Sequence, residues 1–516
     1  MLGISSQAVA LEEPPQVRFV VKEFVVTGDN PLSDTKTRSI LDKFTGEHDG
    51  LEGLQAAADE FESTLRKNGF SFYRVSLVPQ ALEAGIITFE VSEFKINNIV
   101  VEGNKHYSET NILNNAPSLK QGEAPNTSIL SRAINMANNK PAKNLTLRFS
   151  ESETGGAIDA KLIVKDDVPD FFFTNINNTG SSETGRLRIT GGYQFTNLFD
   201  KDHNFSLSYT TSPDNISAVS QIGLAYSIPD YATGSRFDIL VSDSNVDSGL
   251  IGGTVDVSGK GTVISLRYNK IFLQSGSYKQ DIDIGLDHKK FDDDVIFGGF
   301  NSGKKIVSRP LSVAYKGSRL STSGSLDFSI GFASNISGGS KNEDADYAAS
   351  RTGKSAGITT TASADWSKFN YHINYLHFLE NNWLLRFNLV GQEASEMLIS
   401  GELFGVGGSG SVRGFAEREI LGDKGYQINL EIWMPTVTEY EIRPILFYDL
   451  GHTETLDPDT VAGVKAEEDP ASFGAGLRYS WLDKLSMVLD AAYVSAKGGS
   501  SIVGDTRIHF NLSYSF

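Results

Sequence analysis

Apolar and polar side chains alternate with a period of two through most of the chain after residue 169. The last strand-like segment shows the pattern clearly, because Arg, His, Asn and Ser separate its apolar residues Ile508, Phe510, Leu512, Tyr514 and Phe516. Successive side chains of a strand point to opposite faces, so the alternation predicts strands with one apolar and one polar face. The sixteen candidate strands begin near Phe171, Arg186, Asn204, Ser220, Arg236, Val263, Tyr278, Ser308, Ser323, Trp366, Trp383, Tyr426, Glu441, Phe473, Leu485 and Asp505.

The first third of the chain has a different pattern, in which two helix-like segments stand between short strands. The order strand, helix, helix, strand, strand occurs twice, and Gly28 and Gly103 close the first strand of each copy. The predicted elements are 18–26, 33–44, 51–68, 73–78 and 86–91, then 94–101, 108–116, 127–138, 144–149 and 157–164. Repeats of a small unit indicate a modular array. A short mixed sheet also leaves an edge strand that can pair with an extended guest chain.

Composition removes several classes of function. The 516 residues carry a formal net charge of −18, which argues against a nucleic-acid partner because phosphate binding needs a clustered basic face. The chain has no cysteine, so disulfides, thiolate metal sites and cysteine nucleophiles are excluded. Its eight histidines show no HExxH spacing, and neither repeat carries an acid/base or nucleophile constellation. We therefore expect no metal, no cofactor and no enzymatic activity.

The alternating strands could build a soluble β-sandwich or propeller, or a membrane barrel. The sequence contains no run of about eighteen apolar residues, so it predicts no transmembrane helix. The mean hydropathy of −0.21 does not decide between the two, since a barrel with a polar lumen averages to a similar value. Arg, Asp, Gln and Asn on the polar face, aromatic residues near strand ends and a terminal Phe516 favour the barrel.

A glycine-dense segment, Phe404–Phe415, lies between the eleventh and twelfth predicted strands and carries Arg413. Glycine at this density lets the backbone fold tightly and approach other backbone closely. The segment satisfies GxGxxG, but no helix or βαβ unit follows it, so the pattern does not predict a dinucleotide site. GxSxG at 353–357 is interpreted as a polar loop, because no α/β-hydrolase frame surrounds it, and the acidic run 292–294 as a solvated loop in preference to a calcium site.

The repeats carry a resemblance to a known module. The strand endings V-x-G-[DN] and the sequence G-F-x-x-Y-R-V at 69–75, in the βααββ order, resemble tandem POTRA domains. The resemblance implies POTRA domains at 17–93 and 94–168, and the alternation and strand count predict a sixteen-stranded antiparallel transmembrane β-barrel at 169–516. Residues 1–16 are then a tail, in which Ala8-Val9-Ala10 has the form of a signal-peptidase site, although an ordinary flexible terminus would explain it equally well.

The residues Val412, Arg413, Gly414 and Phe415 match the VRG[YF] motif of Omp85-superfamily barrels. With two POTRA units, the chain resembles the two-partner-secretion transporters of the ShlB/FhaC/HecB hemolysin-activator type. The resemblance implies that a loop at about 396–425 folds into the lumen, and that Phe447-x-Asp449 is its partner motif. We therefore predict an ion pair between Arg413 and Asp449, which the alternation places on the lumenal face. Tyr514 and Phe516 resemble the C-terminal signal read by the barrel-assembly machinery.

The resemblance implies a bacterial outer-membrane protein with POTRA domains in the periplasm and outer-membrane lipid around the barrel. Its expected partner is a secreted exoprotein with a two-partner-secretion N-terminal domain, such as an adhesin, a cytolysin or a haem-related protein. We expect the POTRA domains to bind that partner and the barrel to secrete it without nucleotide. The alternative is an outer-membrane assembly factor of the Omp85 type, although such relatives carry three or more POTRA units. A passive porin would have no use for periplasmic modules.

Overall fold

The computed structural model describes residues 18–182, 184–245, 249–251, 255–257, 260–292, 305–355, 357–437, 441–458, 464–482 and 484–516. The chain divides into two compact units. The first comprises 1–103, 112–134 and 145–164, and the second comprises 104–111, 135–144 and 165–516. Among the described residues, no helix has both the length and the apolar character needed to cross a membrane.

The first repeat folds as a small α/β module in the first unit. Its elements are β1 (Arg18–Val21), β2 (Glu23–Gly28), α1 (Asp34–Leu41), η1 (Asp42–Phe44), β3 (Gly46–Asp49), α2 (Glu52–Lys67), β4 (Tyr73–Leu77) and β5 (Ile86–Glu93). The sheet order is β2-β5-β4, with β2 parallel and β4 antiparallel to β5. Phe61 and Leu65 on one face of α2 are fully buried with Ile87 and Phe89 of β5 in one apolar core. The 3.6-residue period of α2 and the alternation of β5 thus meet in the interior.

One predicted strand of this module is wrong in extent. The sequence predicts a single strand from Arg18 to Val26, but the chain forms β1 and β2 with a break at Lys22. The amides of Lys22 and Glu23 both donate to the carbonyl of Gly85, at 2.7 and 3.2 Å, and this contact interrupts regular pairing. β1 instead pairs antiparallel with β3, a strand that the sequence pattern did not predict.

The second repeat has the same order of elements. It consists of β6 (Lys95–Glu102), α3 (Glu109–Asn114), α4 (Thr127–Asn138), β7 (Lys143–Glu151) and β8 (Ala157–Asp166), with sheet order β6-β8-β7. β6 and β8 are parallel, as β2 and β5 are in the first repeat. The segments 104–111 and 135–144 of this repeat belong to the same compact unit as the barrel.

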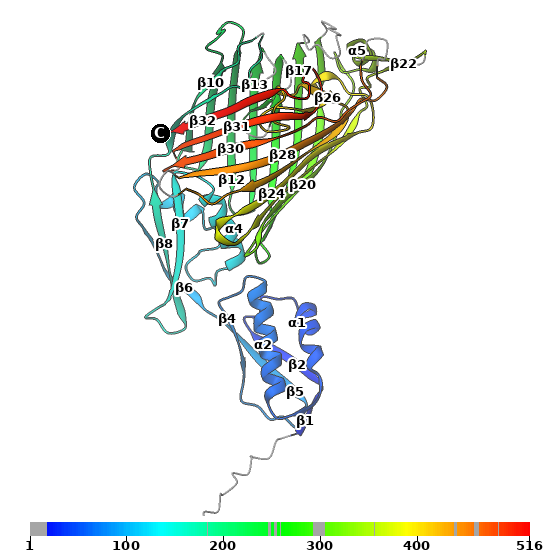
Figure 1. Cartoon of the computed structure of the whole chain (residues 1–516). Coiled ribbons are helices and arrows are strands. Elements are labelled where there is room, and N and C mark those ends of the chain that lie inside the picture. Colours follow the sequence, from blue (N-terminus) through cyan, green and yellow to red (C-terminus); the bar gives the residue numbers. More distant parts are fainter. Residues whose placement is uncertain are drawn as a thin grey trace, which may run out of the picture. The chain divides into compact units, whose positions relative to one another are not determined.

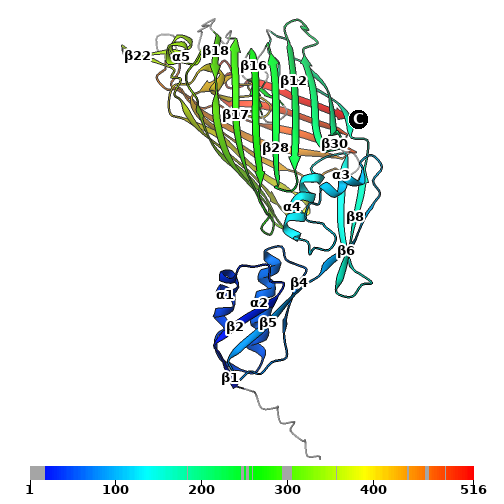
Figure 2. The ribbon, with the colours of Figure 1, turned by 180° about the vertical axis from the view of Figure 1, so that it is seen from behind.

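A closed antiparallel barrel follows (Figure 1), and Figure 2 shows it from behind. Its strands are β9 (Asp170–Asn177), β10 (Arg188–Leu198), β11 (His203–Thr211), β12 (Ser220–Asp230), β13 (Ser235–Ser244), β16 (Gly261–Ile271), β17 (Tyr278–Asp292), β19 (Pro310–Ser321), β20 (Gly324–Asn335), β23 (Ser367–Phe378), β24 (Leu384–Ala394), β27 (Lys424–Trp433), β28 (Ile442–Glu454), β30 (Ala471–Trp481), β31 (Leu485–Ala496) and β32 (Thr506–Ser515). The short β18 (Lys305–Ser308) precedes β19 and also pairs with β17, and the short β29 (Glu467–Glu468) precedes β30 and also pairs with β28. Counting each short strand with the long one that follows it, the described chain forms a sixteen-stranded barrel. This confirms the predicted barrel, and every predicted strand begins within two residues of an observed one.

Side-chain exposure follows the alternation around the barrel. On β28, Leu446 and Tyr448 are 46 % and 43 % exposed, whereas Phe447 and Asp449 are 5 % and 0 % exposed. Apolar residues thus cover the outside, and polar residues line the lumen, as a bilayer on one side and water on the other require. Hydrogen bonds between β32 and β9 close the barrel, and the terminal Phe516 stacks on Phe172.

The two ends of the barrel differ. Short turns join the strands at one end, such as 231–234 between β12 and β13, whereas loops such as 336–366 and 395–423 join them at the other. Outer-membrane barrels have short periplasmic turns and longer extracellular loops, so the long loops mark the outer mouth. One of them contains α5 (Asp344–Ser350), a helix that the sequence pattern did not predict. Small strands also form in these loops: β14 (Gly249–Ile251), β15 (Val255–Val257), β21 (Thr352–Ser355) and β22 (Ile358–Thr361).

A buried polar cluster lies at the end with the short turns. Asp202, after β10, pairs with Lys143 at 2.6 Å, and both side chains are fully buried. Tyr231 and Asn111 also donate to Asp202, at 2.6 and 3.2 Å. Lys140 adds a second cation 3.8 Å from the same carboxylate, so one acid faces two lysines. Burial lowers the pKa of Lys140 to about 8.

Candidate functional site

The segment between β24 and β27 enters the lumen as a folded loop, which we call the inward loop (residues 395–423). It contains η3 (Ser400–Glu402), and its limbs pair through β25 (Phe404–Val406) and β26 (Ile420–Gly422). At the turn, Gly407 and Gly414 have φ of 114° and 97°, which L side chains rarely adopt. A Cβ on Gly407 would also lie 2.5 Å from the carbonyl oxygen of Ala416. The glycines are therefore required by the path of this backbone.

Apolar residues hold the tip of the inward loop in place. Val406, Val412, Phe415 and Ile420 form one buried cluster with Val494 of β31, and each is at most 2 % exposed. These side chains fix the direction in which the intervening Arg413 leaves the loop. The four residues of the predicted motif thus have different roles. Val412 and Phe415 pack in the apolar cluster, Gly414 adopts the positive φ of the loop turn, and Arg413 carries the positive charge of the loop tip.

Arg413 is 3 % exposed and contacts both predicted partners on β28. Its Nε and Nη2 atoms donate to the two oxygens of Asp449, each at 2.7 Å, and its backbone amide donates to the same carboxylate at 3.1 Å. The guanidinium carbon lies 3.5 Å from the centre of the Phe447 ring. A planar guanidinium suits both contacts, because it pairs with a carboxylate in its plane and stacks on an aromatic face.

Two further carboxylates contact Arg413 that the motif alone did not identify. Its Nη2 atom lies 2.9 Å from Glu431 of β27, and its Nη1 atom lies 3.4 Å from Asp490 of β31. The alternation on β27 puts Glu431 on the polar face, so the pattern placed this residue in the lumen without naming its partner. Arg386 pairs with Glu431 at 3.2 Å, and Arg478 pairs with Asp490 at 2.6 Å. Three arginines thus face three carboxylates with no net charge.

Neutral groups complete this arginine clamp, by which we mean Arg413, its three carboxylates and Phe447. Asn429 donates to Asp449 at 2.8 Å and to the carbonyl of Ser411 at 2.7 Å, so it joins the barrel wall to the loop. The amide of Gly414 donates to Nε2 of His509 at 3.0 Å. Because Nε2 accepts this bond, the His509 ring carries no proton there.

A second buried carboxylate holds the first limb of the loop to another part of the wall. Glu402 is 2 % exposed and pairs with Lys289 of β17 at 3.0 Å and with Lys368 of β23 at 2.9 Å. Its neighbour Leu403 packs in an apolar cluster that includes Trp366. The inward loop therefore has charged contacts with the β17–β23 side and with the β27–β31 side.

The other residues singled out in the sequence lie away from this clamp. Tyr514 and Phe516 stack on each other at the end of β32. The acidic run at 292–294 lies outside the described residues except for Asp292, and the GxSxG segment does so at residue 356. Within the described ranges, no group of three or more His, Asp or Glu side chains is arranged to hold a metal ion.

A closed antiparallel barrel with an apolar outside and a polar lumen, with small α/β modules before it in the chain, defines an outer-membrane β-barrel protein. The family model for the haemolysin secretion/activation protein ShlB/FhaC/HecB matches residues 156–479, and the ShlB-type POTRA domain matches residues 19–93. The chain belongs to this haemolysin secretion/activation family. It is an outer-membrane transporter of the two-partner-secretion type, and its POTRA modules lie in the periplasm.

Individual relatives agree with this assignment. The chain is 22 % identical over 459 residues to the heme/hemopexin transporter protein HuxB of Haemophilus influenzae strain 86-028NP, covering 86 % of this chain and 77 % of that protein. It is 23 % identical over 461 residues to the outer membrane transporter CdiB of Escherichia coli, covering 85 % and 74 %.

Solved structures share the fold. CdiB from Escherichia coli superposes with a TM-score of 0.75 at 18 % identity, covering 99 % of this chain and 93 % of that chain. BamA from Haemophilus ducreyi lacking POTRA domains 1–3 reaches a TM-score of 0.53 at 14 % identity, covering 96 % and 100 %. The family match and the transporter relatives favour the transporter over the assembly factor that the sequence left as an alternative.

Proposed function

We propose that this chain exports one large, mostly β-structured exoprotein through its barrel, without nucleotide and without an enzymatic step. The observation that supports this proposal is the inward loop, which a buried arginine clamp holds inside the lumen. A loop fastened inside the lumen suits a barrel that is plugged at rest. A conduit for one unfolded chain needs a closed resting state and a way to leave it.

The periplasmic modules are suited to capture that exoprotein by strand addition. In the first module, the outer strands β2 and β4 each pair with β5 in the order β2-β5-β4. The described chain offers no further partner strand in this sheet, so the outer edges can pair with an extended guest. Val25 on β2 and Ile86 on β5 are 36 % and 45 % exposed, which adds an apolar surface for the guest. Binding a strand here would bring the exoprotein to the barrel unfolded.

The arginine clamp acts in this proposal as a tether of the inward loop. The exoprotein passes once the loop, or the wall beside it, moves enough to open a path. Asp449 and Phe447 then hold Arg413 between transport events, and folding of the cargo outside draws the chain outward. Tyr514 and Phe516 serve assembly, as the signal that the barrel-assembly machinery reads when the protein enters the outer membrane.

The test is to delete this protein in its own host and to follow the exoprotein encoded beside it. The expected result is loss of that exoprotein from the medium and its accumulation in the periplasm, while other outer-membrane barrels still assemble. Restoring the intact chain should restore secretion, and an Arg413→Ala chain should not. A general loss of other barrels would instead support the assembly-factor alternative.

A further inference from the structure

A second buried arginine–carboxylate pair lies at the outer mouth, apart from the arginine clamp. Asp423 is the last residue of the inward loop and is fully buried. Arg351 follows α5 in the neighbouring loop and is 7 % exposed. Its Nη1 and Nη2 atoms donate to the two oxygens of Asp423, at 2.6 and 2.9 Å. This geometry is the planar two-bond pairing that a guanidinium forms best.

Asp423 and Arg351 together join three loops of the outer mouth. The Asp423 carboxylate accepts hydrogen bonds from the backbone amides of Leu398 at 2.7 Å and Leu456 at 2.8 Å. Arg351 donates to the carbonyl of Leu398 at 2.6 Å. Leu398 and Asp423 stand at the two ends of the inward loop, and Leu456 belongs to the loop after β28. One ion pair therefore fastens the base of the inward loop to the loops on both sides.

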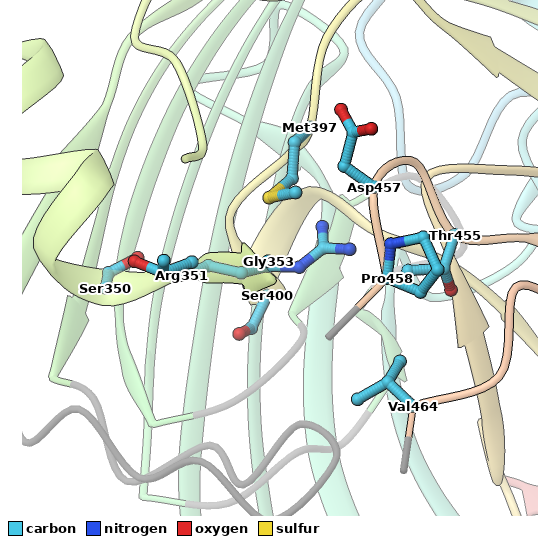
Figure 3. A pocket seen from close by; sticks show the side chains of 10 residues that line it. Ser350, Arg351, Gly353, Met397, Ser400, Thr455, Asp457, Pro458 and Val464 are labelled. Carbon is cyan, nitrogen blue, oxygen red and sulfur yellow. The ribbon is translucent and has the colours of Figure 1, made fainter. Parts of the chain in front are cut away.

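The described residues around this pair leave room for little more than water. Figure 3 shows the Arg351 guanidinium pointing into a small cavity between the Met397 and Pro458 side chains. The cavity has a volume of about 20 Å³, which is room for about one water molecule. Met397 and Leu398 also belong to the apolar cluster that includes Tyr347 and Trp366. The pair is thus a joint between loops, and losing either charge would leave the other buried without its partner.

We propose that Arg351 and Asp423 form a latch that keeps the outer mouth closed at rest, separate from the tether at Arg413. The inward loop cannot swing out of the lumen while its base is fastened to its neighbours. The tether holds the tip of the loop to the wall, whereas the latch holds its base to the rim. Exit of the cargo requires the latch to release. The inference rests on the proposed transport function for the release step, because exit of the cargo is the event that would open the latch.

The test measures leakage through the outer membrane in cells that produce the full chain. Arg351→Met and Asp423→Asn should each lower the minimal inhibitory concentration of vancomycin several-fold, because an unlatched loop admits a large hydrophilic molecule. The double variant should leak no more than either single one, since both remove the same contact. The control is Arg188→Met. Arg188 is also buried at a loop end, but its bonds to Thr184, Gly185 and Leu187 stay within its own loop.

Folding is checked by heat-modifiable mobility on gels and by conductance of the purified barrels in planar bilayers. A folded Arg351→Met barrel with the conductance and vancomycin resistance of Arg188→Met would overturn the latch. Arg351→Lys is the second variant, because it keeps the charge but loses the two-bond geometry, and it should leak to an intermediate degree. Additive leakage in the double variant would also contradict the proposal.

Secretion separates this inference from the function on which it rests. If Arg413→Ala abolishes export of the cargo while Arg351→Met neither leaks nor changes conductance, transport stands and the latch is wrong. If Arg351→Met leaks but the intact chain exports no cargo, the latch stands and the transport proposal fails. The two readouts are independent, since vancomycin entry needs no exoprotein.

Discussion

Arg413→Ala should free the tip of the inward loop from the barrel wall, and the arginine clamp sets the size of the effect. Glu431 and Asp490 would keep Arg386 and Arg478 as partners. Asp449 would keep only the amide bonds from Asn429 and the loop backbone, although its side chain is fully buried. Removing one partner of a buried ion pair costs about 3 to 5 kcal/mol. At about 1.4 kcal/mol per factor of ten, the state with the loop tip released becomes about a hundredfold to a few thousandfold more populated.

The absence of cysteine allows this population to be measured with one introduced thiol. Val412 is fully buried beside Arg413, and Val412→Cys replaces it with a side chain of similar size. When the loop closes faster than the reagent reacts, the maleimide labelling rate follows the open fraction. We expect the maleimide to label Val412→Cys about a hundredfold faster, or more, when Arg413→Ala is also present. This factor is the lower end of the population change given above.

The matched control is Arg267→Ala. Arg267 is a lumenal arginine of β16 that pairs with Asp287 of the adjoining strand β17 at 2.5 Å. The substitution removes the same charge from the lumen without touching the clamp, so it should leave labelling of Val412→Cys unchanged. Equal labelling in the Arg413→Ala and Arg267→Ala backgrounds would refute the reasoning that the buried pair holds the loop.

Three further predictions concern other parts of the chain. Asp449→Asn should accelerate the same labelling less than Arg413→Ala does, because Arg413 keeps Glu431 and Asp490; a larger effect would contradict the shared clamp. Phe61→Ala in the fully buried core of the first module should lower its stability by about 3 to 5 kcal/mol in urea unfolding, while an exposed Glu60→Ala changes it little. Raising the pH from 7 to 9.5 should stabilise the cluster around Asp202, measured as protection from limited proteolysis. The reason is that the pKa of Lys140, about 8 when folded, lies below its ordinary 10.5, so protonation favours the unfolded chain; Lys140→Met should weaken this dependence.

The residue pattern alone predicts the architecture of this chain. Alternation with a period of two identifies each barrel strand locally, because one face must meet lipid and the other water whatever the neighbours are. The same rule places Phe447 and Asp449 in the lumen from the residues of their own strand alone. Helix periodicity and short repeats likewise predict most elements of both modules. Where the local signal is weak, as at the break between β1 and β2 or at α5, the pattern predicts the wrong extent or no element at all.

Which lumenal charges meet depends on how the barrel closes around the inward loop. Glu431 and Asp490 have the same local pattern as other polar-face residues, and closure of the barrel brings β27 and β31 within reach of one arginine. Arg351 and Asp423 stand 72 residues apart, with no periodicity linking them. The alternation of the neighbouring residues determines which face of the sheet a side chain occupies. Its partner depends on strand register and on the loops that packing brings close to it.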